Sequence, residues 1–314
     1  MGDCAVSATT FQHERVLEHE LIGAAGAPVT LVLGGISATR HVLSGPHDTT
    51  PGWWDGIGGE GRVLDPARRR VLGIDFADGG ETLDGRPEQV VTTRDQATAI
   101  VSLLDALQIE QLDAVLGASY GGMVALALAE QSPERVRRLV VISAAHEPHP
   151  MATALRSIQR AIVELALQSD STTEGMVIAR ALAMTTYRSA RELAERFPPE
   201  SGAALDASAH PVFAVEQYLR HAGEKFASRM RAARFLALSL SADVHRVDPH
   251  EVTVPVTLIA AQGDTLVPAS QMRALARELP NLVGYHMLRS RRGHDAFLTE
   301  TGRLSRLLST ILDD

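Results

Sequence analysis

The chain has 314 residues, of which 45% are hydrophobic and 22% are charged, and its formal net charge is −8. This composition is ordinary for a globular enzyme with a large core, and the negative charge argues against a nucleic-acid or acidic membrane partner. The single cysteine, Cys4, excludes an intramolecular disulfide and a thiolate metal cluster. Because no signal-peptide pattern and no apolar run of about 18 residues is visible, we expect a soluble, cytoplasmic protein.

The first half of the chain alternates short apolar segments with amphipathic ones. In chain order, the predicted elements are strand Val29–Leu33, strand Val71–Phe76, helix Arg94–Leu107, strand Leu112–Leu116, helix Tyr120–Gln131 and strand Arg138–Ser143. Several of these strands are almost entirely apolar, as expected for strands that are buried on both faces of a parallel sheet. Strands that alternate with helices predict βαβ units and a doubly wound sheet.

The alternation stops after Ser143. From about residue 150 to 241 the chain is rich in Ala, Leu, Arg and Glu at helical spacing, which predicts helices and no strand. It then resumes with strand Val254–Ala260, helix Ala269–Leu279, strand Val283–Leu288 and helix Thr299–Leu312. We therefore predict an α/β fold. Residues 1–145 and 250–314 form its doubly wound, mostly parallel core, and 146–249 form a helical cap inserted over the edge of the sheet.

A nucleophile motif lies between a predicted strand and a predicted helix. The run Gly117-Ala118-Ser119-Tyr120-Gly121 matches the G-x-S-x-G elbow in the strand–turn–helix context that the motif requires. A serine hydroxyl is a weak nucleophile at neutral pH. Ser119 therefore needs a base, a group that orients this base, and an oxyanion hole.

The elbow in this order of elements predicts the α/β-hydrolase fold, in which an acid and then a histidine follow the nucleophile in chain order. Asp264 comes after the strand Val254–Ala260 at a glycine turn, and His294 comes after the strand Val283–Leu288. Because the carboxyl ends of parallel strands meet at one edge of the sheet, these side chains are expected to lie close together. We predict that His294 is the general base for Ser119 and that Asp264 orients it.

Two backbone N–H groups are predicted to form the oxyanion hole. One belongs to Tyr120, the residue after the nucleophile, and the other to Ile36, in a glycine-containing loop after the first strand. No metal site is expected, because the histidines lack metal-ligand spacing and the single cysteine is remote.

Several motifs resemble those of the homoserine O-acyltransferase family of the MetX type. They are Pro51-Gly52-Trp53-Trp54-Asp55, Val91-Thr92-Thr93-Arg94-Asp95-Gln96, Gly121-Gly122-Met123, Thr186-Tyr187-Arg188-Ser189, Gln217-Tyr218-Leu219-Arg220, Gly223-Glu224-Lys225-Phe226 and Gly293-His294-Asp295-Ala296-Phe297-Leu298. The resemblance covers roughly Leu31 to the C-terminus and includes the cap, which general esterases do not share. The segment Gly34-Gly35-Ile36-Ser37-Ala38 looks most like the short forms known as homoserine O-succinyltransferases.

The resemblance implies roles for two further residues. Arg188 aligns with the cap arginine that holds the homoserine carboxylate, and Asp295 aligns with the acid that binds the homoserine ammonium group. An amino-acid acceptor needs one cation and one anion in a dry pocket, and arginine suits a bidentate carboxylate. The resemblance also implies a homodimer formed through the cap.

The activity that the resemblance implies is transfer of a succinyl group, with acetyl as the second choice, from acyl-CoA to L-homoserine in methionine biosynthesis. Acyl-CoA would be a co-substrate, and no permanently bound cofactor is expected. A succinyl donor carries an extra carboxylate, and the candidate cations for it are Arg156, Arg160, Arg289, Arg291 and Arg292. A homoserine O-acetyltransferase, a serine O-acyltransferase and a capped esterase with the same triad remain as alternatives.

Overall fold

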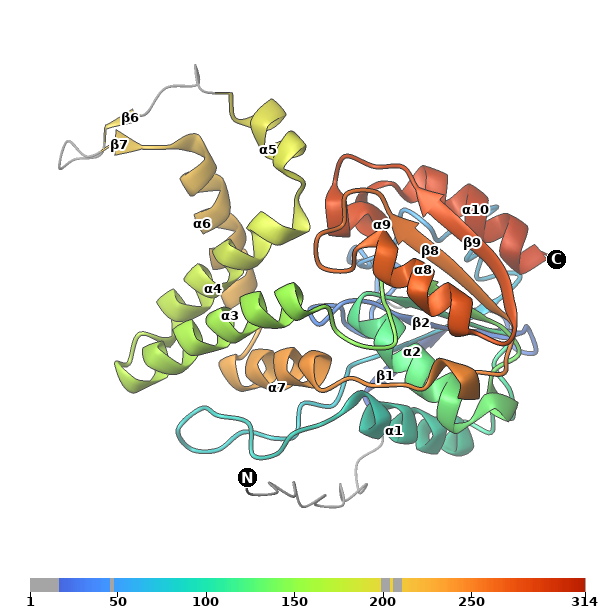
Figure 1. Cartoon of the computed structure of the whole chain (residues 1–314). Coiled ribbons are helices and arrows are strands. Elements are labelled where there is room, and N and C mark those ends of the chain that lie inside the picture. Colours follow the sequence, from blue (N-terminus) through green and yellow to red (C-terminus); the bar gives the residue numbers. More distant parts are fainter. Residues whose placement is uncertain (1–16, 46–47, 199–203, 206–210, 314) are drawn as a thin grey trace.

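The computed structural model describes residues 17–45, 48–198, 204–205 and 211–313, so Cys4 lies outside the described residues. Its main feature is a seven-stranded sheet in the order β1-β3-β2-β4-β5-β8-β9 (Figure 1). These strands are β1 (His19–Ile22), β2 (Val29–Leu33), β3 (Arg70–Ile74), β4 (Ala114–Ala118), β5 (Leu139–Ile142), β8 (Val256–Ala261) and β9 (Leu282–Leu288). All neighbouring strands of this sheet are parallel except β1 and β3. The predicted doubly wound, mostly parallel sheet is therefore confirmed.

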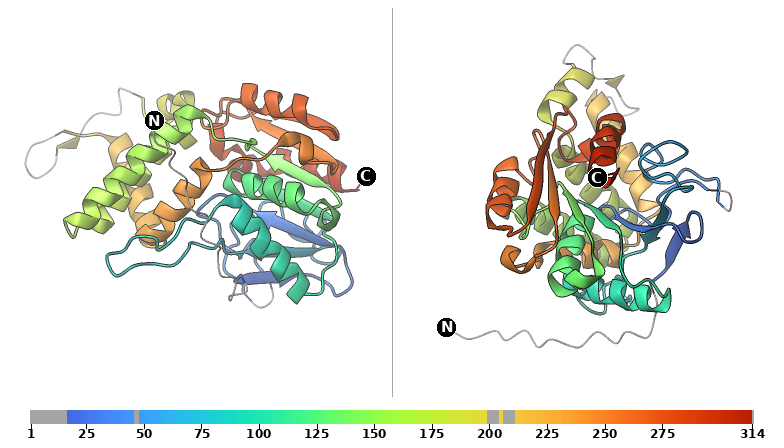
Figure 2. Two further views of the ribbon diagram at one scale, coloured as in Figure 1. Left: turned by 60° about the horizontal axis from the view of Figure 1, so that its bottom comes forward. Right: turned by 90° about the vertical axis from the view of Figure 1, so that its right-hand side faces the viewer.

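Helices cover both faces of this sheet. One face packs against α1 (Thr93–Ala106), α2 (Tyr120–Gln131) and α8 (Ala269–Glu278), and the other face packs against α10 (Thr301–Asp313). In the right-hand view of Figure 2, α8 and α10 lie on opposite sides of β8 and β9. The central strands β2, β4, β5 and β8 are buried over their whole length, which explains their almost continuous apolar sequences.

In the described part of the chain, five α-helices between β5 and β8 form the cap at one end of the sheet, on the left in Figure 1. They are α3 (Pro150–Gln168), α4 (Thr172–Tyr187), α5 (Ala190–Arg196), α6 (Ala214–Ala227) and α7 (Ala232–Asp243). The cap has a core of its own, to which Val163, Met176, Phe226 and Phe235 contribute. The end of α4 contacts the short 3₁₀ turn Gly293–Asp295, so the cap lies directly over the loop that carries His294.

The structure differs from the sequence-based elements where segments are short. Strand β1 was missed because four half-buried residues at the sheet edge leave no periodic pattern. Two-residue strands β6 (Ala204–Leu205) and β7 (Pro211–Val212) lie in the segment for which only helices were predicted. The last predicted helix, Thr299–Leu312, corresponds to α10, and the short helix α9 (Ala296–Thr299) before it was not predicted. In the described part of the chain, no helix is both long and apolar enough to cross a membrane.

Candidate active site

Ser119 lies at a sharp turn between β4 and α2. Its backbone φ of 55° and ψ of −124° place it in a region that non-glycine residues rarely adopt. Two glycines make this turn possible: a Cβ atom on Gly117 would lie 2.5 Å from the carbonyl oxygen of Gly121, and one on Gly121 would lie 2.4 Å from the backbone of Leu33. The glycines of the elbow motif are therefore required by the close approach of β4, α2 and β2.

The structure brings Ser119, His294 and Asp264 together in one series of hydrogen bonds. The Ser119 Oγ lies 2.8 Å from the His294 Nε2, and the His294 Nδ1 lies 2.8 Å from the Asp264 Oδ2. The other carboxylate oxygen of Asp264 accepts the backbone N–H groups of Leu266 and Val267 at 2.9 and 3.0 Å. These two bonds fix the carboxylate, so that the ring of His294 is oriented with one nitrogen toward Ser119.

Both partners of Ser119 are buried, and their burial affects proton transfer. Burial disfavours the charged ring of His294 and lowers its pKa, but the charge and hydrogen bond of Asp264, with a further contribution from Asp295, raise it above its ordinary value. Since a general base must be neutral before it accepts a proton, the ring is competent only above this raised pKa. The geometry therefore supplies a base that is strengthened by its orienting acid.

The two residues predicted to form the oxyanion hole lie at the same pocket as the nucleophile. Ile36 and Tyr120 both line the pocket next to Ser119, and the N–H of Gly121 donates to the carbonyl oxygen of Gly34 at 2.8 Å. This bond holds the Ile36 loop against the elbow. Among the residues that the structure describes, the backbone N–H groups of Ile36 and Tyr120 have no acceptor. Both donors are thus available to a developing oxyanion, and their role stays a prediction.

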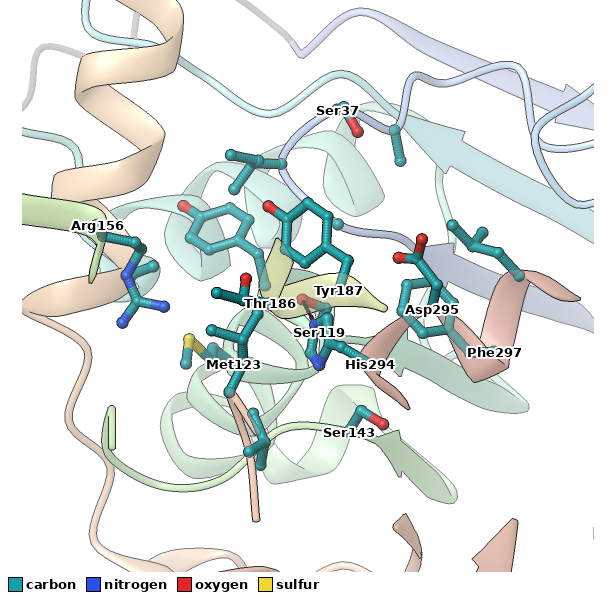
Figure 3. Close-up of a pocket in the computed structure, with 18 of the residues that line it drawn as sticks. Ser37, Ser119, Met123, Ser143, Arg156, Thr186, Tyr187, His294, Asp295 and Phe297 are labelled. Carbon is teal, nitrogen blue, oxygen red and sulfur yellow. Dashed lines mark hydrogen bonds between the residues drawn. The ribbon is translucent and has the colours of Figure 1, made fainter. Parts of the chain in front are cut away.

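A pocket lies between the cap and the core above Ser119 (Figure 3). The loop after β2, the elbow, the helices α3 and α4, and the loops after β8 and β9 all contribute to its wall. The lining residues are mostly apolar or small, and the charged ones besides His294 are Arg156, Arg180 and Asp295. A concave apolar pocket with a few charged groups is typical of a site for a small polar substrate.

Asp295 lines this pocket beside His294, whereas Arg188 does not belong to the pocket wall. The Arg188 Nη2 lies 3.3 Å from the Asp295 Oδ2, and its Nη1 lies 3.7 Å from the Glu192 Oε1. Arg188 ends α4 in an extended backbone conformation, and its guanidinium lies behind Asp295. In this structure the guanidinium of Arg188 faces Asp295, and its role in holding the acceptor stays a prediction.

The pair of Asp295 and Arg188 is buried but not fully satisfied. Burial raises the pKa of Asp295 above its ordinary value, although the charges of Arg188 and His294 oppose this shift. The Nε and Nη1 atoms of Arg188 are buried without a hydrogen-bond partner in the described part of the chain. Buried donors without acceptors are costly, which favours a site that binds an anion.

Sequence reasoning did not identify Arg180, a half-buried residue that lines the pocket. Its guanidinium carbon lies 4.9 Å from the centre of the Tyr187 ring and 4.8 Å from that of the Phe226 ring. A signal existed, since Arg180 and the motif residue Tyr187 are seven residues apart and share a face of one helix. Of the five arginines considered for a donor carboxylate, Arg156 lines the pocket and the other four do not.

The comparisons with known proteins agree with this geometry. The family model described as alpha/beta hydrolase fold matches residues 31–301. Over 303 residues the chain is 41% identical to a homoserine O-succinyltransferase of Xanthomonas campestris, covering 96% of this chain and 80% of that protein. It is 34% identical to a homoserine O-acetyltransferase of Thermobifida fusca over 90% of this chain and 83% of that protein. A serine O-succinyltransferase of Litchfieldella anticariensis is 32% identical over 91% of this chain and 89% of its own length.

Solved structures show the same fold at lower sequence identity. Esterase E22 and a homoserine O-acetyltransferase from Bacillus anthracis each match 94% of this chain with a TM-score of 0.83, at 20% and 17% identity, over 93% and 91% of their own chains. An esterase and a transferase thus share this architecture, and the fold alone does not separate them. The sequence relatives do distinguish the two activities, because they are acyltransferases and match nearly the whole chain, including the cap. This chain belongs to the homoserine O-acyltransferases, a family of acyltransferases with the α/β-hydrolase fold.

Proposed function

We propose that this protein transfers an acyl group from acyl-CoA to the hydroxyl group of L-homoserine, a step of methionine biosynthesis in the cytoplasm. The observation that carries the proposal is a hydrogen-bonded Ser119, His294 and Asp264 at a pocket that also contains arginines and Asp295. A triad supports acyl transfer, and opposite charges beside it suit an amino acid as the acceptor. The steps use protein groups and the two substrates alone, with acyl-CoA as co-substrate.

In the first half-reaction, His294 takes the proton of the Ser119 hydroxyl while the Ser119 oxygen attacks the thioester carbon. The carbonyl oxygen becomes an oxyanion that the N–H groups of Ile36 and Tyr120 stabilise. Collapse of this intermediate breaks the carbon–sulfur bond, and CoA leaves as a thiol with the proton from His294. The product is an ester of Ser119.

In the second half-reaction, the hydroxyl group of homoserine occupies the position that the thiol has left. His294 removes the hydroxyl proton, and the homoserine oxygen attacks the ester carbon through a second oxyanion. When the bond to Ser119 breaks, the proton returns from His294 to the serine oxygen. The result is O-acylhomoserine and free enzyme, and the two half-reactions predict ping-pong kinetics.

The acceptor is expected to bind on the Asp295 side of the pocket. We propose that Asp295 pairs with the ammonium group and that Arg188 and Arg180 bind the carboxylate, Arg180 from the pocket wall and Arg188 through its two unpartnered nitrogens. For Asp295→Asn we expect a rise of about 100-fold in the KM for homoserine, because one partner of a buried charge pair is lost. Steady-state kinetics with varied homoserine measure this value.

The rate of Ser119 acylation shows whether a variant has lost acceptor binding alone or catalytic activity as a whole. It should stay near the wild-type value in Asp295→Asn, because the thioester does not need the ammonium site. Arg188→Lys keeps the charge and should raise the KM for homoserine less than Arg188→Met does. If Asp295→Asn lowers the acylation rate by as large a factor as it raises the KM for homoserine, Asp295 does not bind the acceptor.

The experiment that tests the function is release of CoA thiol from succinyl-CoA and acetyl-CoA, with homoserine, with serine, or with water alone. Homoserine-dependent turnover supports the proposal. Steady turnover in water would make the protein a hydrolase of the esterase type, and equal stimulation by serine would contradict homoserine as the acceptor. We favour the succinyl donor because the relative with 41% identity is a homoserine O-succinyltransferase.

We further propose that two copies of this chain associate through α3. Its outer face carries Met151, Ile158 and Leu165 at seven-residue spacing, and these residues are 57%, 51% and 65% exposed. Leu155 and Ile162 lie between them and are half-buried. Alternating spacings of four and three residues form the seam that packs against another helix. A two-fold axis pairs this stripe with itself, so a second copy is a complementary occupant.

For Ile158→Glu we expect a monomer where the wild type is a dimer, because a charge would be buried in the centre of the paired stripes. Light scattering coupled to size exclusion measures the mass. Ile178→Glu is the matched control, since Ile178 is an exposed cap residue outside the stripe on α4. A monomeric wild type, or loss of the dimer in both variants, would contradict the proposed interface.

A further inference from the structure

We infer that Ser241, on the cap helix α7, holds the oxyanion donor Tyr120 in place through the phenol group of Tyr120. The inference rests on the proposed function, in which the Tyr120 N–H stabilises the oxyanion. It makes Ser241 and the Tyr120 side chain positioning groups, and it gives the cap a part in the chemistry as well as in enclosing the pocket.

The peptide group between Ser119 and Tyr120 carries the predicted donor and lies in a strained turn. Ser119 has a backbone φ of 55°, which a residue with a side chain keeps only when its surroundings hold it there. The Tyr120 N–H has no backbone acceptor among the described residues, so no such bond fixes its direction. Because the Tyr120 side chain is attached next to this nitrogen, its contacts limit how far the N–H can turn.

The Tyr120 phenol reaches the cap. Its oxygen lies 2.8 Å from the Ser241 Oγ, and the two residues are 2% and 0% exposed. Burial raises the pKa of the phenol to about 12, although its bond with Ser241 and the charge of Arg234 act in the opposite direction. The phenol therefore keeps its proton near neutral pH, and one of the two hydroxyl groups donates to the other.

A second contact from α7 supports the same ring. The Phe76 ring meets the Tyr120 ring edge to face, with their centres 4.8 Å apart. The carbonyl oxygen of Phe76 accepts a hydrogen bond from the Arg234 Nη1 at 2.6 Å. Arg234 and Ser241 are seven residues apart, so both lie on one face of α7. This face therefore holds the Tyr120 ring at its hydroxyl group and, through Phe76, at its side.

Tyr120 lines the pocket, whereas Ser241 does not. Among the described residues, the Ser241 hydroxyl group bonds to the side chain of Tyr120 alone. Replacing Ser241 with alanine therefore removes no group from the pocket wall, and its effect on the reaction passes through Tyr120. A displaced donor stabilises the oxyanion less, whereas binding of the neutral thioester depends little on it. The expected result is a slower chemical step with nearly unchanged substrate binding.

Single-turnover acylation of Ser119 measures this step, with thiol release from acyl-CoA as the signal and no acceptor present. For Ser241→Ala we expect the maximal acylation rate to fall about 10-fold, a part of the roughly 100- to 1,000-fold loss that follows removal of a whole donor. The half-saturating concentration of acyl-CoA should change less than about twofold. Tyr120→Phe should give the same loss, and the double variant should lose no more than either single variant, because both remove one hydrogen bond.

Two CoA thioethers separate oxyanion stabilisation from a general loosening of the fold. One carries a trifluoromethyl ketone: the Ser119 oxygen adds to the ketone carbon, the serine proton passes to His294, and the ketone oxygen becomes an oxyanion at the donors. The other carries a propyl group, which forms no oxyanion. The ratio of their inhibition constants should favour the ketone about 10-fold less in Ser241→Ala than in the wild type. A merely structural role would weaken both analogues alike and leave this ratio unchanged.

Ser239→Ala is the matched control. Ser239 is also a fully buried serine of α7, but its hydroxyl group accepts from the Arg160 Nη1 at 3.0 Å and not from the elbow. This variant should lower the melting temperature about as much as Ser241→Ala does and leave the ratio at the wild-type value. An unchanged ratio in Ser241→Ala, an equal fall in Ser239→Ala, or additive losses in the double variant would overturn the inference.

None of these outcomes depends on the acceptor. Steady thiol release without homoserine contradicts the proposed function, yet the ratio still reports on Ser241, because a hydrolase forms the same oxyanion. Conversely, a homoserine-dependent enzyme whose ratio stays at the wild-type value in Ser241→Ala contradicts the inference alone.

Discussion

Replacing Ser119 with alanine is expected to lower turnover of acyl-CoA about 10⁶-fold, the scale of nucleophile removal in a serine triad. The loss is large because the Ser119 oxygen forms the only covalent bond between the protein and the acyl group in the proposed path. Without it, His294 and Asp264 have no group to activate, and the oxyanion donors alone give little rate. The folded structure should be unaffected, since the Ser119 hydroxyl bonds to His294 and to no other side chain of the described residues.

Mass spectrometry of the protein after mixing with acyl-CoA, without acceptor, measures the acyl-enzyme directly. The wild type should gain one acyl group on Ser119, and Ser119→Ala should gain none. Ser143→Ala is the matched control, because Ser143 follows the neighbouring strand β5, lines the same pocket and has a buried hydroxyl without a partner. Acyl labelling that persists in Ser119→Ala, or that disappears in Ser143→Ala, would contradict the assignment of the nucleophile.

The placement of the triad could be predicted from the sequence because three strand ends meet at one edge of a parallel sheet. The elbow follows β4, Asp264 follows β8 and His294 follows β9, so the order of elements alone brings them together. Glycines reinforce the prediction, since Gly263 and Gly293 both have positive φ and precede the acid and the histidine. Backbone features such as these depend on residues that are close together in the sequence, so the sequence can predict them.

The cap side of the pocket could not be predicted in the same way. Whether an arginine on a cap helix points into the pocket depends on how α3 and α4 lie over the core, and the sequence pattern of one helix does not contain that orientation. Arg180 and Arg156 reach the pocket, whereas Arg188, singled out by its motif, stands behind Asp295. The shortest strands were missed for a related reason, because they depend on a partner strand rather than on a period of their own.

Replacing Asp264 with asparagine is expected to lower the rate of acylation about 10⁴-fold while the protein stays folded. The asparagine fits the same space and can still accept the N–H groups of Leu266 and Val267 through its oxygen. Its amide group can, however, donate to the Nδ1 of His294, which favours the tautomer whose proton lies on Nε2. That nitrogen then faces Ser119 as a donor and cannot take the proton of the hydroxyl group.

The pH dependence of the residual rate gives a second, independent signature of Asp264. In the wild type, Asp264 raises the pKa of His294, so acylation should fall as the pH drops through a midpoint above the ordinary histidine value. Loss of the negative charge lowers that pKa, and the neutral ring then persists to lower pH. The acid limb of Asp264→Asn should therefore move to lower pH, as measured by stopped-flow CoA release across a pH series.

Asp295→Asn is the matched control for this signature, because Asp295 also raises the pKa of His294 but makes no hydrogen bond to its ring. Its acid limb should likewise move to lower pH, yet its acylation rate at high pH should stay close to that of the wild type. A charge effect and an orientation effect are thus separated by two neighbouring carboxylates. If both variants lose rate equally at high pH, orientation of His294 by Asp264 is not what sustains acylation.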